Sequence, residues 1–237
     1  MLEISNVQTY GWQAAIRGMR NPLNSWAKSD SGHELLYVDD NGEKVYNADF
    51  TLGSNDLDLA CRLIKAGPEH AKFLRMIHVQ MDITAPLYYW KEMDQYRVGT
   101  TTNSCSTMHK ISAKEFGLSD FSHEHLHIYS WTNLNSLVDT LNFWRNVYIN
   151  GGTVDNLDGT AQVFEPKSKN AWWQMIQLLP SSYNQLRTWD GSLATVLSIC
   201  KQRKGHKLDE WETFRQACFE NIPYFNEFYD AMTGGNE

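Results

Sequence analysis

The sequence lacks most of the features that would assign it quickly to a class of protein. The patterns GxSxG, GxxxxGK[ST] and GxGxxG are absent from its 237 residues, so nucleophile-elbow hydrolases, P-loop proteins and Rossmann dinucleotide-binding proteins have no motif support. No apolar stretch approaches the roughly 18 residues that a membrane-spanning helix requires. The segment MLEISNVQTY has no basic region followed by an apolar run, so we expect no signal peptide and no membrane association.

Cysteine and positive charge are also scarce. Four cysteines, at positions 61, 105, 200 and 218, form no CxxC pair, and three of them lie in apolar, helix-like surroundings. We therefore expect free thiols and a reducing, cytoplasmic location. The net charge of −7 and the pI near 5.6 argue against a protein that wraps nucleic acid. A small anionic ligand held by local arginines stays compatible with this charge.

What is present indicates an ordinary folded domain. Hydrophobic residues make up 42% of the chain and aromatic residues 13%, which excludes disorder. Without an internal repeat or a linker, we expect one domain over residues 1–237, of the α+β class, with helices packed on a small sheet. The expected elements are strands over 2–9 and 77–83, a hairpin around Asp40-Asn41-Gly42, helices over 11–19, 54–66, 86–98 and 131–148, a loop over 151–160, and mainly helix from residue 170.

The sequence also predicts the caps of one helix and leaves two possible roles for the polar face of one strand. Ser54 or Asn55 is suited to cap the helix that begins there, and Gly67-Pro68 is suited to end it. The polar face of the strand over 77–83, formed by His78, Gln80 and Asp82, either is solvated or lines a site.

The most specific stretch is QYRVGTTTNSCSTMH, residues 95–109. Short hydroxyl and amide side chains dominate it, and it follows an aromatic helical run, which predicts a loop that holds a polar ligand. Arg97 lies in this stretch, and Arg187 and Arg203 lie near other expected helix ends. Each arginine either binds a phosphate, which guanidinium groups do in a bidentate manner, or is an ordinary surface residue.

A metal site is the other possibility raised by single residues. On a strand, the three histidines of the run His123-Glu124-His125-Leu126-His127 would share one face, but no Cys, Asp or Glu cluster with recognisable ligand spacing accompanies it. The preceding Ser-Asp-Phe-Ser indicates a loop or a helix start. We therefore expect surface or helix-capping histidines and no bound metal.

The order of several segments resembles the flavin-dependent thymidylate synthases, the ThyX family. That family has a strand ending in Ala-Pro, then a helix, then the signature R-H-R-x-x-S-x-N-E-x-S-x-R. The corresponding segments here are HVQMDITAPLYYWKEMDQYRVGTTTNSCSTMH and, upstream, AAIRGMRNPLNS and SNDLDLACRLIKAG. Downstream, LLPSSYNQLRTW and KQRKGHKLDEW are similar to the family's Leu-Pro…Arg and Arg…His…Gln-Trp-Glu segments. Residues 115–169 match least.

The signature is altered in this chain. Gln95 and Tyr96 stand where the family has its first Arg and its His, and Arg97 keeps the second Arg. Thr100 replaces a Ser, and Asn103-Ser104 replaces Asn-Glu after a one-residue insertion, so a carboxylate is lost.

The resemblance nevertheless implies a full set of site residues. The expected flavin contacts are Gln95, Tyr96, Arg97, Thr100, Asn103 and His70; the expected nucleotide contacts are Glu92, Ser104, Ser106, His109, Arg187 and Arg203. Met108 takes the place of the final Arg, and Arg203 is the expected catalytic residue.

The resemblance implies an enzyme that acts at C5 of a deoxyuridine nucleotide, converting dUMP to dTMP or making a related modification. FAD would be its cofactor, methylene-tetrahydrofolate the carbon donor and NADPH the reductant, in a homotetramer. The family uses no protein nucleophile, so positioning and electrostatics supply the catalysis. The alternative is a non-catalytic nucleotide- or flavin-binding protein that kept the fold, which the altered signature favours.

Overall fold

The computed structural model describes residues 1–39 and 41–235. The chain divides into two compact units. Unit 1 comprises residues 1–3, 83–95 and 103–188, and unit 2 comprises residues 4–82, 96–102 and 189–237. The expectation of a single domain stays a prediction, and each unit is described by itself.

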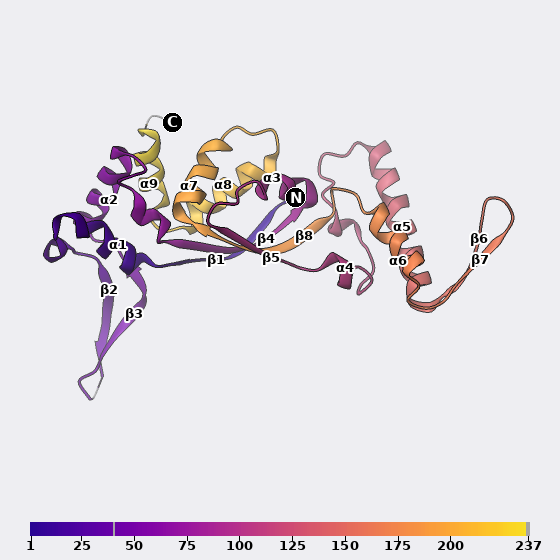
Figure 1. Cartoon of the computed structure of the whole chain (residues 1–237), viewed down its shortest axis with the longest axis horizontal. Coiled ribbons are helices and arrows are strands. Elements are labelled where there is room, and N and C mark those ends of the chain that lie inside the picture. Colours follow the sequence, from indigo (N-terminus) through magenta and orange to yellow (C-terminus); the bar gives the residue numbers. More distant parts are fainter. Residues whose placement is uncertain (40, 236–237) are drawn as a thin grey trace. The chain divides into compact units, whose positions relative to one another are not determined.

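The largest sheet has four strands in the order β1-β4-β8-β5 (Figure 1). Its strands are β1 (Glu3–Tyr10), β4 (His78–Pro86), β8 (Asn184–Ser192) and β5 (Thr100–Ser104). In β4, Val79, Met81 and Ile83 are buried and alternate with more exposed residues, which confirms the expected strand with one apolar face. β5 is an edge strand, and it contains the middle of the stretch QYRVGTTTNSCSTMH, residues 95–109, which we call the signature segment.

Unit 2 contains the helices that cover its own core. They are α1 (Trp12–Arg20), α2 (Ser54–Ala66), α7 (Leu193–Gln202), α8 (Asp209–Asn221) and α9 (Phe225–Thr233), with the short 3₁₀ helices η1 (Asn21–Leu23), η2 (Trp26–Lys28) and η3 (Lys72–Arg75). The ring of Phe228 on α9 contacts Trp12 on α1 and Phe73 on η3. Gly11 precedes α1 with φ 88°, and a Cβ there would lie 2.2 Å from the carbonyl oxygen of Met76. Only glycine fits this approach between α1 and η3.

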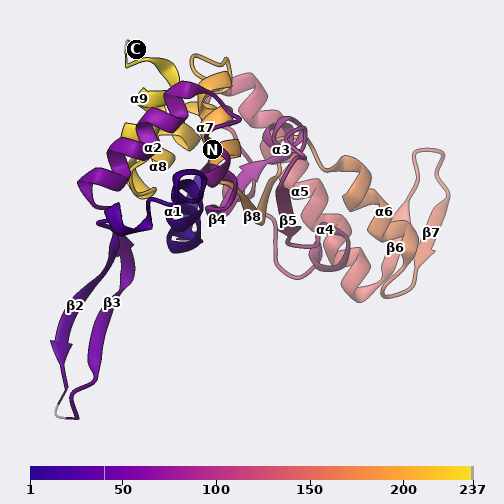
Figure 2. The same ribbon diagram turned by 60° about the vertical axis from the view of Figure 1, so that its left-hand side comes forward.

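A long hairpin extends from unit 2, away from α1 and α2 (Figure 2). It consists of β2 (Gly32–Val38) and β3 (Lys44–Thr51), paired antiparallel from Gly32↔Thr51 to Val38↔Lys44. This confirms the expected hairpin, although Asp40 of its turn lies outside the described residues. The exposed apolar side chains of the hairpin are Leu35, Leu36, Tyr37, Val38 and Tyr46.

Unit 1 is built around a long helix. Its elements besides the sheet are α3 (Leu87–Met93), α4 (Thr107–Lys110), η4 (Leu118–Asp120), α5 (Ile128–Asn150), α6 (Lys169–Leu178) and the hairpin β6 (Gly152–Asp155)–β7 (Ala161–Phe164). Leu134, Val138 and Leu141 of α5 pack with Met175 of α6 and Phe121 in one buried cluster. The spacing of these α5 residues is that of one helix face.

The α+β expectation is confirmed, and several local expectations are wrong. The helix expected over 86–98 ends at Met93, and residues 100–104 form a strand where a loop was expected. The expected loop over 151–160 contains β6 and the turn into β7. The chain after residue 170 holds the strand β8, so Arg187 lies on a strand and not at a helix end.

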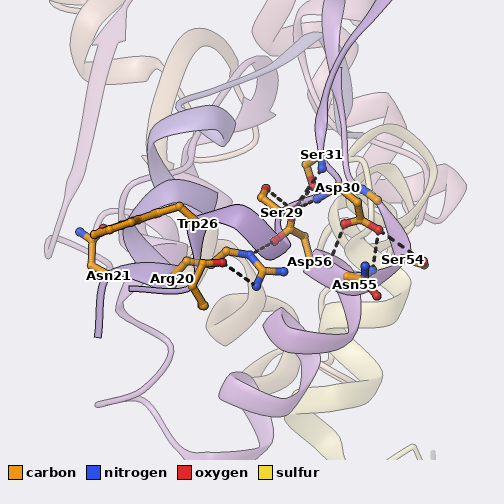
Figure 3. Close-up of polar contacts among 11 residues, drawn as sticks. Arg20, Asn21, Trp26, Ser29, Asp30, Ser31, Ser54, Asn55 and Asp56 are labelled. Atoms are coloured by element: carbon orange, nitrogen blue, oxygen red, sulfur yellow. Dashed lines mark hydrogen bonds and ion pairs between the residues drawn. The ribbon is translucent and has the colours of Figure 1, made fainter. Parts of the chain in front are cut away.

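The cap of α2 also differs from the expectation. Gly53 occupies the N-cap position, and Ser54 and Asn55 already belong to the helix. The carboxylate of Asp30 accepts hydrogen bonds from the backbone N–H groups of Asn55, at 2.9 Å, and Asp56, at 3.1 Å (Figure 3). A side chain distant in sequence therefore supplies the cap that the local sequence was expected to supply.

Candidate functional site

The first part of the signature segment connects α3 to β5. Residues 94–95 and 98–99 form turns, and Gly99 has φ 67°, a conformation that favours glycine. Gln95 and Arg97 are exposed, whereas Tyr96 is half-buried. The hydroxyl of Thr100 donates a hydrogen bond to the carbonyl oxygen of Tyr96. This bond fixes the backbone at Tyr96.

Arg203 lies at the end of α7, inside a cluster of rings in unit 2. Its Nε donates to the hydroxyl oxygen of Tyr96 at 2.8 Å, and its Nη1 lies 3.1 Å from Nε2 of His206. Its Cζ lies 4.6 Å from the ring centroid of Trp211 and 5.4 Å from that of Tyr96. We call Tyr96, Arg203, His206 and Trp211 the Arg203 cluster.

The Arg203 cluster holds a guanidinium group in a defined orientation. The Tyr96 and Trp211 rings meet edge to face at 6.2 Å, an attractive arrangement for aromatic pairs. Because Arg203 is positioned over these ring faces, cation–π attraction adds to the hydrogen bonds. The hydroxyl of Tyr96 donates in turn to Oε1 of Gln202 at 3.4 Å. The charge is thus pre-oriented, as recognition of an anion or a polarised carbonyl requires.

Arg187 is held by a different set of groups, in unit 1. It lies on β8 with its Cζ 4.3 Å from the Trp90 ring centroid. Its Nη1 donates to Oδ1 of Asp94 at 2.8 Å, and its Nε donates to Oε1 of Gln185 at 3.0 Å. A phosphate that binds Arg187 must therefore compete with the Asp94 carboxylate or share the guanidinium with it.

Other predicted residues of unit 1 lie along β5 and the short helix after it. Asn103, Ser104 and Ser106 are exposed. The Ser106 hydroxyl oxygen accepts from the backbone N–H of His109 at 3.3 Å and so caps α4. This is a structural use of a residue that the resemblance assigns to the nucleotide. Glu92 is half-buried on α3.

His70 lies apart from these groups along the chain, between α2 and η3. It lines a pocket of about 530 Å³ in unit 2, together with Asn21, Ser25, Lys72 and Phe73. Its Nε2 is 3.8 Å from the exposed carboxylate of Glu69, which also lines the pocket. His70, the predicted flavin contact, therefore lines a cavity that has both hydrogen-bond donors and an apolar wall.

The histidine run of residues 123–127 lies in the segment before α5. This segment forms neither a helix nor a strand, so the shared face that a strand would give the three histidines is not formed. His127 is the N-cap of α5, and its Nδ1 accepts from the backbone N–H of Tyr129. No group of three or more potential metal ligands occurs among residues 1–39 and 41–235.

The cysteines carry no disulfide in the described part of the chain. Cys200 and Cys218 are buried, Cys61 is half-buried and Cys105 is exposed. Among the described residues, no helix is long and apolar enough to cross a membrane.

Comparison with known proteins places this geometry in a known fold. No protein-family model matches the chain, and no curated protein sequence matches it. A crystal structure of thymidylate synthase X from Helicobacter pylori with FAD and dUMP matches with a TM-score of 0.61 and 16% identity, over 98% of this chain and 99% of that chain. A second structure of the same enzyme with FAD and dUMP gives a TM-score of 0.60 and 16% identity, over 97% and 99%. The chain has the thymidylate synthase X fold.

The sequence predicted Arg187 and Arg203 as site residues, but it did not predict the side chains that position them. Trp90, Asp94 and Gln185 position Arg187, and His206 and Trp211 position Arg203. The signal for His206 and Trp211 was present, because both lie in KQRKGHKLDEW, the segment that resembles the family's Arg…His…Trp run. Asp94 had no comparable signal, since only the return of β8 beside α3 brings Arg187 to it.

Proposed function

We propose that this protein is a thymidylate synthase X-like enzyme that acts at C5 of a deoxyuridine nucleotide, with dUMP as substrate and FAD as cofactor. The observation that carries the proposal is the Arg203 cluster, in which Tyr96 and Trp211 orient the guanidinium that the sequence resemblance assigns as catalytic. The likeness to structures that contain FAD and dUMP supports the ligand classes.

The chain's own residues have separate tasks in this proposal. Arg203 donates to a carbonyl oxygen of the pyrimidine and stabilises the negative charge that develops on the ring, because a fixed cation needs no reorganisation during the reaction. Tyr96 fixes Arg203 through the bond to Nε. Arg187 contacts the nucleotide phosphate, and Ser104, Ser106 and His109 lie on the same stretch of unit 1 as further polar contacts.

The flavin has a candidate site in the His70 pocket. Its volume of about 530 Å³ lies within the range of about 300–1,000 Å³ that is usual for ligand sites. Asn21, Ser25 and Lys72 supply hydrogen-bond donors, and Phe73 supplies an apolar wall. This donor set fits part of FAD, and Tyr96, Arg97 and Asn103 are the proposed further contacts. Bound flavin supplies hydride-transfer chemistry, with methylene-tetrahydrofolate and NADPH as the proposed co-substrates.

The test measures flavin binding, nucleotide binding and turnover separately. We expect the purified protein to bind FAD, visible in its absorbance spectrum, and to convert dUMP to dTMP when methylene-tetrahydrofolate and NADPH are present. Arg203→Ala should abolish turnover while the protein remains folded. Arg62→Ala is the matched control, because Arg62 is exposed and pairs only locally, with Asp58 four residues earlier.

Two other outcomes would contradict the enzymatic proposal. A protein that binds dUMP but leaves it unchanged with all co-substrates present is a nucleotide-binding protein. A colourless protein that acquires no flavin when FAD is added has a different cofactor or none. A homotetramer belongs to the same proposal, and light scattering should give four times the chain mass of 27.4 kDa.

A further inference from the structure

A second pocket in unit 2 contains none of the residues assigned above. It lies between α1, η2 and the base of the β2–β3 hairpin, with a volume of about 370 Å³. We call it the hairpin pocket. Its lining residues are Gln13, Ile16, Arg17, Arg20, Trp26, Ser29, Ser31, Gly32, His33, Tyr46 and Phe50.

The lining of the hairpin pocket carries positive charge only. Arg17 and Arg20 line it, and among the described residues no carboxylate belongs to the lining, although the whole chain has a net charge of −7. The His70 pocket, by contrast, includes Glu69, and a third pocket beside β1 includes Asp49. Such a concentration of one sign of charge in a concave site attracts an anion.

Arg20 is held rigidly at the wall of this pocket (Figure 3). It is 4% exposed, and its Nε lies 2.5 Å from Oδ1 of Asp56, while its Nη1 donates to the carbonyl oxygen of Ser25 at 3.4 Å. Neither contact uses Nη2. Asp56 is not part of the lining, so the guanidinium stands between its carboxylate and the cavity. A fixed guanidinium loses little entropy when it binds an anion.

The network behind Arg20 explains why the guanidinium is fixed. Oδ2 of Asp56 accepts from the hydroxyls of Ser29 and Ser31, both at 2.6 Å. It also accepts from the backbone N–H groups of Asp30 and Ser31, at 3.1 and 3.2 Å. These bonds hold Ser29 and Ser31, which line the pocket, against α2.

The hairpin pocket is also lined by aromatic side chains. Trp26 is 50% exposed and Tyr46 is 49% exposed, so their rings offer surface to a ligand. The indole N–H of Trp26 donates to Oδ1 of Asn21 at 2.9 Å, and the rings of His33 and Phe50 meet edge to face at 5.4 Å. Aromatic faces beside a cation are suited to a planar ring that carries an anionic group.

We propose that the hairpin pocket binds an aromatic compound with one phosphate group, of which nucleoside monophosphates are the representative class. The base packs against Trp26 and Tyr46, and the phosphate binds Arg17 and Arg20. The cavity volume is near the lower end of the usual range for ligand sites, which matches one ring system and one phosphate. This site is separate from the residues proposed for dUMP and does not depend on them.

The experiment uses adenosine 5′-monophosphate as the probe, with adenosine and inorganic phosphate as matched arms. Isothermal titration calorimetry of the full chain should show binding of the monophosphate, and weaker binding of each arm. Arg17→Ala should weaken the monophosphate at least about tenfold, equivalent to about 1.4 kcal/mol, and leave adenosine unchanged. Trp26→Ala should weaken both. Both side chains are exposed, so neither variant removes a buried contact.

Two controls separate this site from the proposed catalytic one. Arg62→Ala removes an exposed arginine on α2, outside the pocket, and should change nothing. Arg203→Ala should weaken dUMP but not the adenosine nucleotide. Absence of monophosphate binding, equal binding of inorganic phosphate alone, or full affinity in both Arg17→Ala and Trp26→Ala would overturn the proposal.

Discussion

Two arginine–aspartate pairs, one in each unit, show how differently the same chemistry is used. In unit 2, Nε of Arg20 lies 2.5 Å from Asp56, and the side chains are 5% and 0% exposed. In unit 1, Nη1 of Arg187 lies 2.8 Å from Asp94, and the side chains are 15% and 46% exposed. The distances are similar, whereas the exposure of the two carboxylates is not.

The difference in burial separates a pair whose carboxylate is shielded from solvent from a pair whose carboxylate is accessible to it. Burial by itself raises the pKa of Asp56, but hydrogen bonds from Ser29, Ser31 and Arg20 and the charge of Arg20 lower it below the ordinary value. The carboxylate therefore stays ionised inside the protein. Asp94 faces solvent with almost half of its side chain, where water screens the pair. The following predictions test this contrast, in order of decreasing effect.

The largest effect is expected from Asp56→Ala. Removing one partner of a buried pair leaves an uncompensated charge, which typically destabilises a protein by about 3–5 kcal/mol. Urea unfolding followed by circular dichroism should measure this loss. Asp94→Ala is the matched variant, and an equal loss there would show that burial does not distinguish the two pairs.

The second effect concerns nucleotide binding at the exposed pair. Arg187→Ala should weaken dUMP at least about tenfold, about 1.4 kcal/mol, because the phosphate loses its guanidinium partner. Arg187→Lys should recover only part of the affinity, since an ammonium cannot bind in a bidentate manner. Calorimetry checks both variants, and unchanged affinity in Arg187→Ala would remove this residue from the proposed site.

The third effect is the acid dependence of the buried pair. Because the pKa of Asp56 is lower in the folded state than the unfolded value of about 3.9, its contribution to stability is complete above that value. The contribution is lost as the pH falls through the folded pKa. The stability gap between the unmodified protein and Asp56→Asn should thus narrow on acidification. A gap independent of pH would mean that the carboxylate is not the group responsible.

The smallest effect is expected from Asp94→Asn. An exposed ion pair contributes about 0–1 kcal/mol, so the free energy of unfolding should change by no more than that. Affinity for dUMP should rise, because the phosphate no longer competes with a negative charge for Arg187. A fall in affinity would indicate that Asp94 orients the guanidinium for the ligand instead of competing for it.

The parts of the fold that follow from local pattern were predictable from the sequence. Val79, Met81 and Ile83 alternate strictly, and Gly67 ends α2 with φ 121°, so β4 and α2 were both identified. β8 was missed because its sequence, NQLRTWDGS, has little apolar alternation. Its strand conformation comes from pairing with β4 and β5, which are distant in sequence.

The sequence likewise predicted some contacts of the candidate site and its surroundings and not others. Tyr96 and Arg203 were predicted from the resemblance, and unit 2 brings them into direct contact. The cap on α2 was assigned to local residues, but Asp30 supplies it across 25 positions. No local sequence pattern indicated the hairpin pocket, because Arg17 and Arg20 lie far along the chain from Tyr46 and Phe50, which also line it. Contacts set by chain return are not visible in local spacing.

The exposed β2–β3 hairpin has a consequence for how the protein behaves at high concentration. Leu35, Leu36, Tyr37 and Val38 are consecutive, uncharged and exposed on a two-stranded sheet. Such a segment is a template for edge-to-edge association. Glu34 and Asp39 flank the run, and their like charges oppose stacking of hairpins. Colloidal stability should therefore decline as added salt screens these charges, before any loss of folded structure.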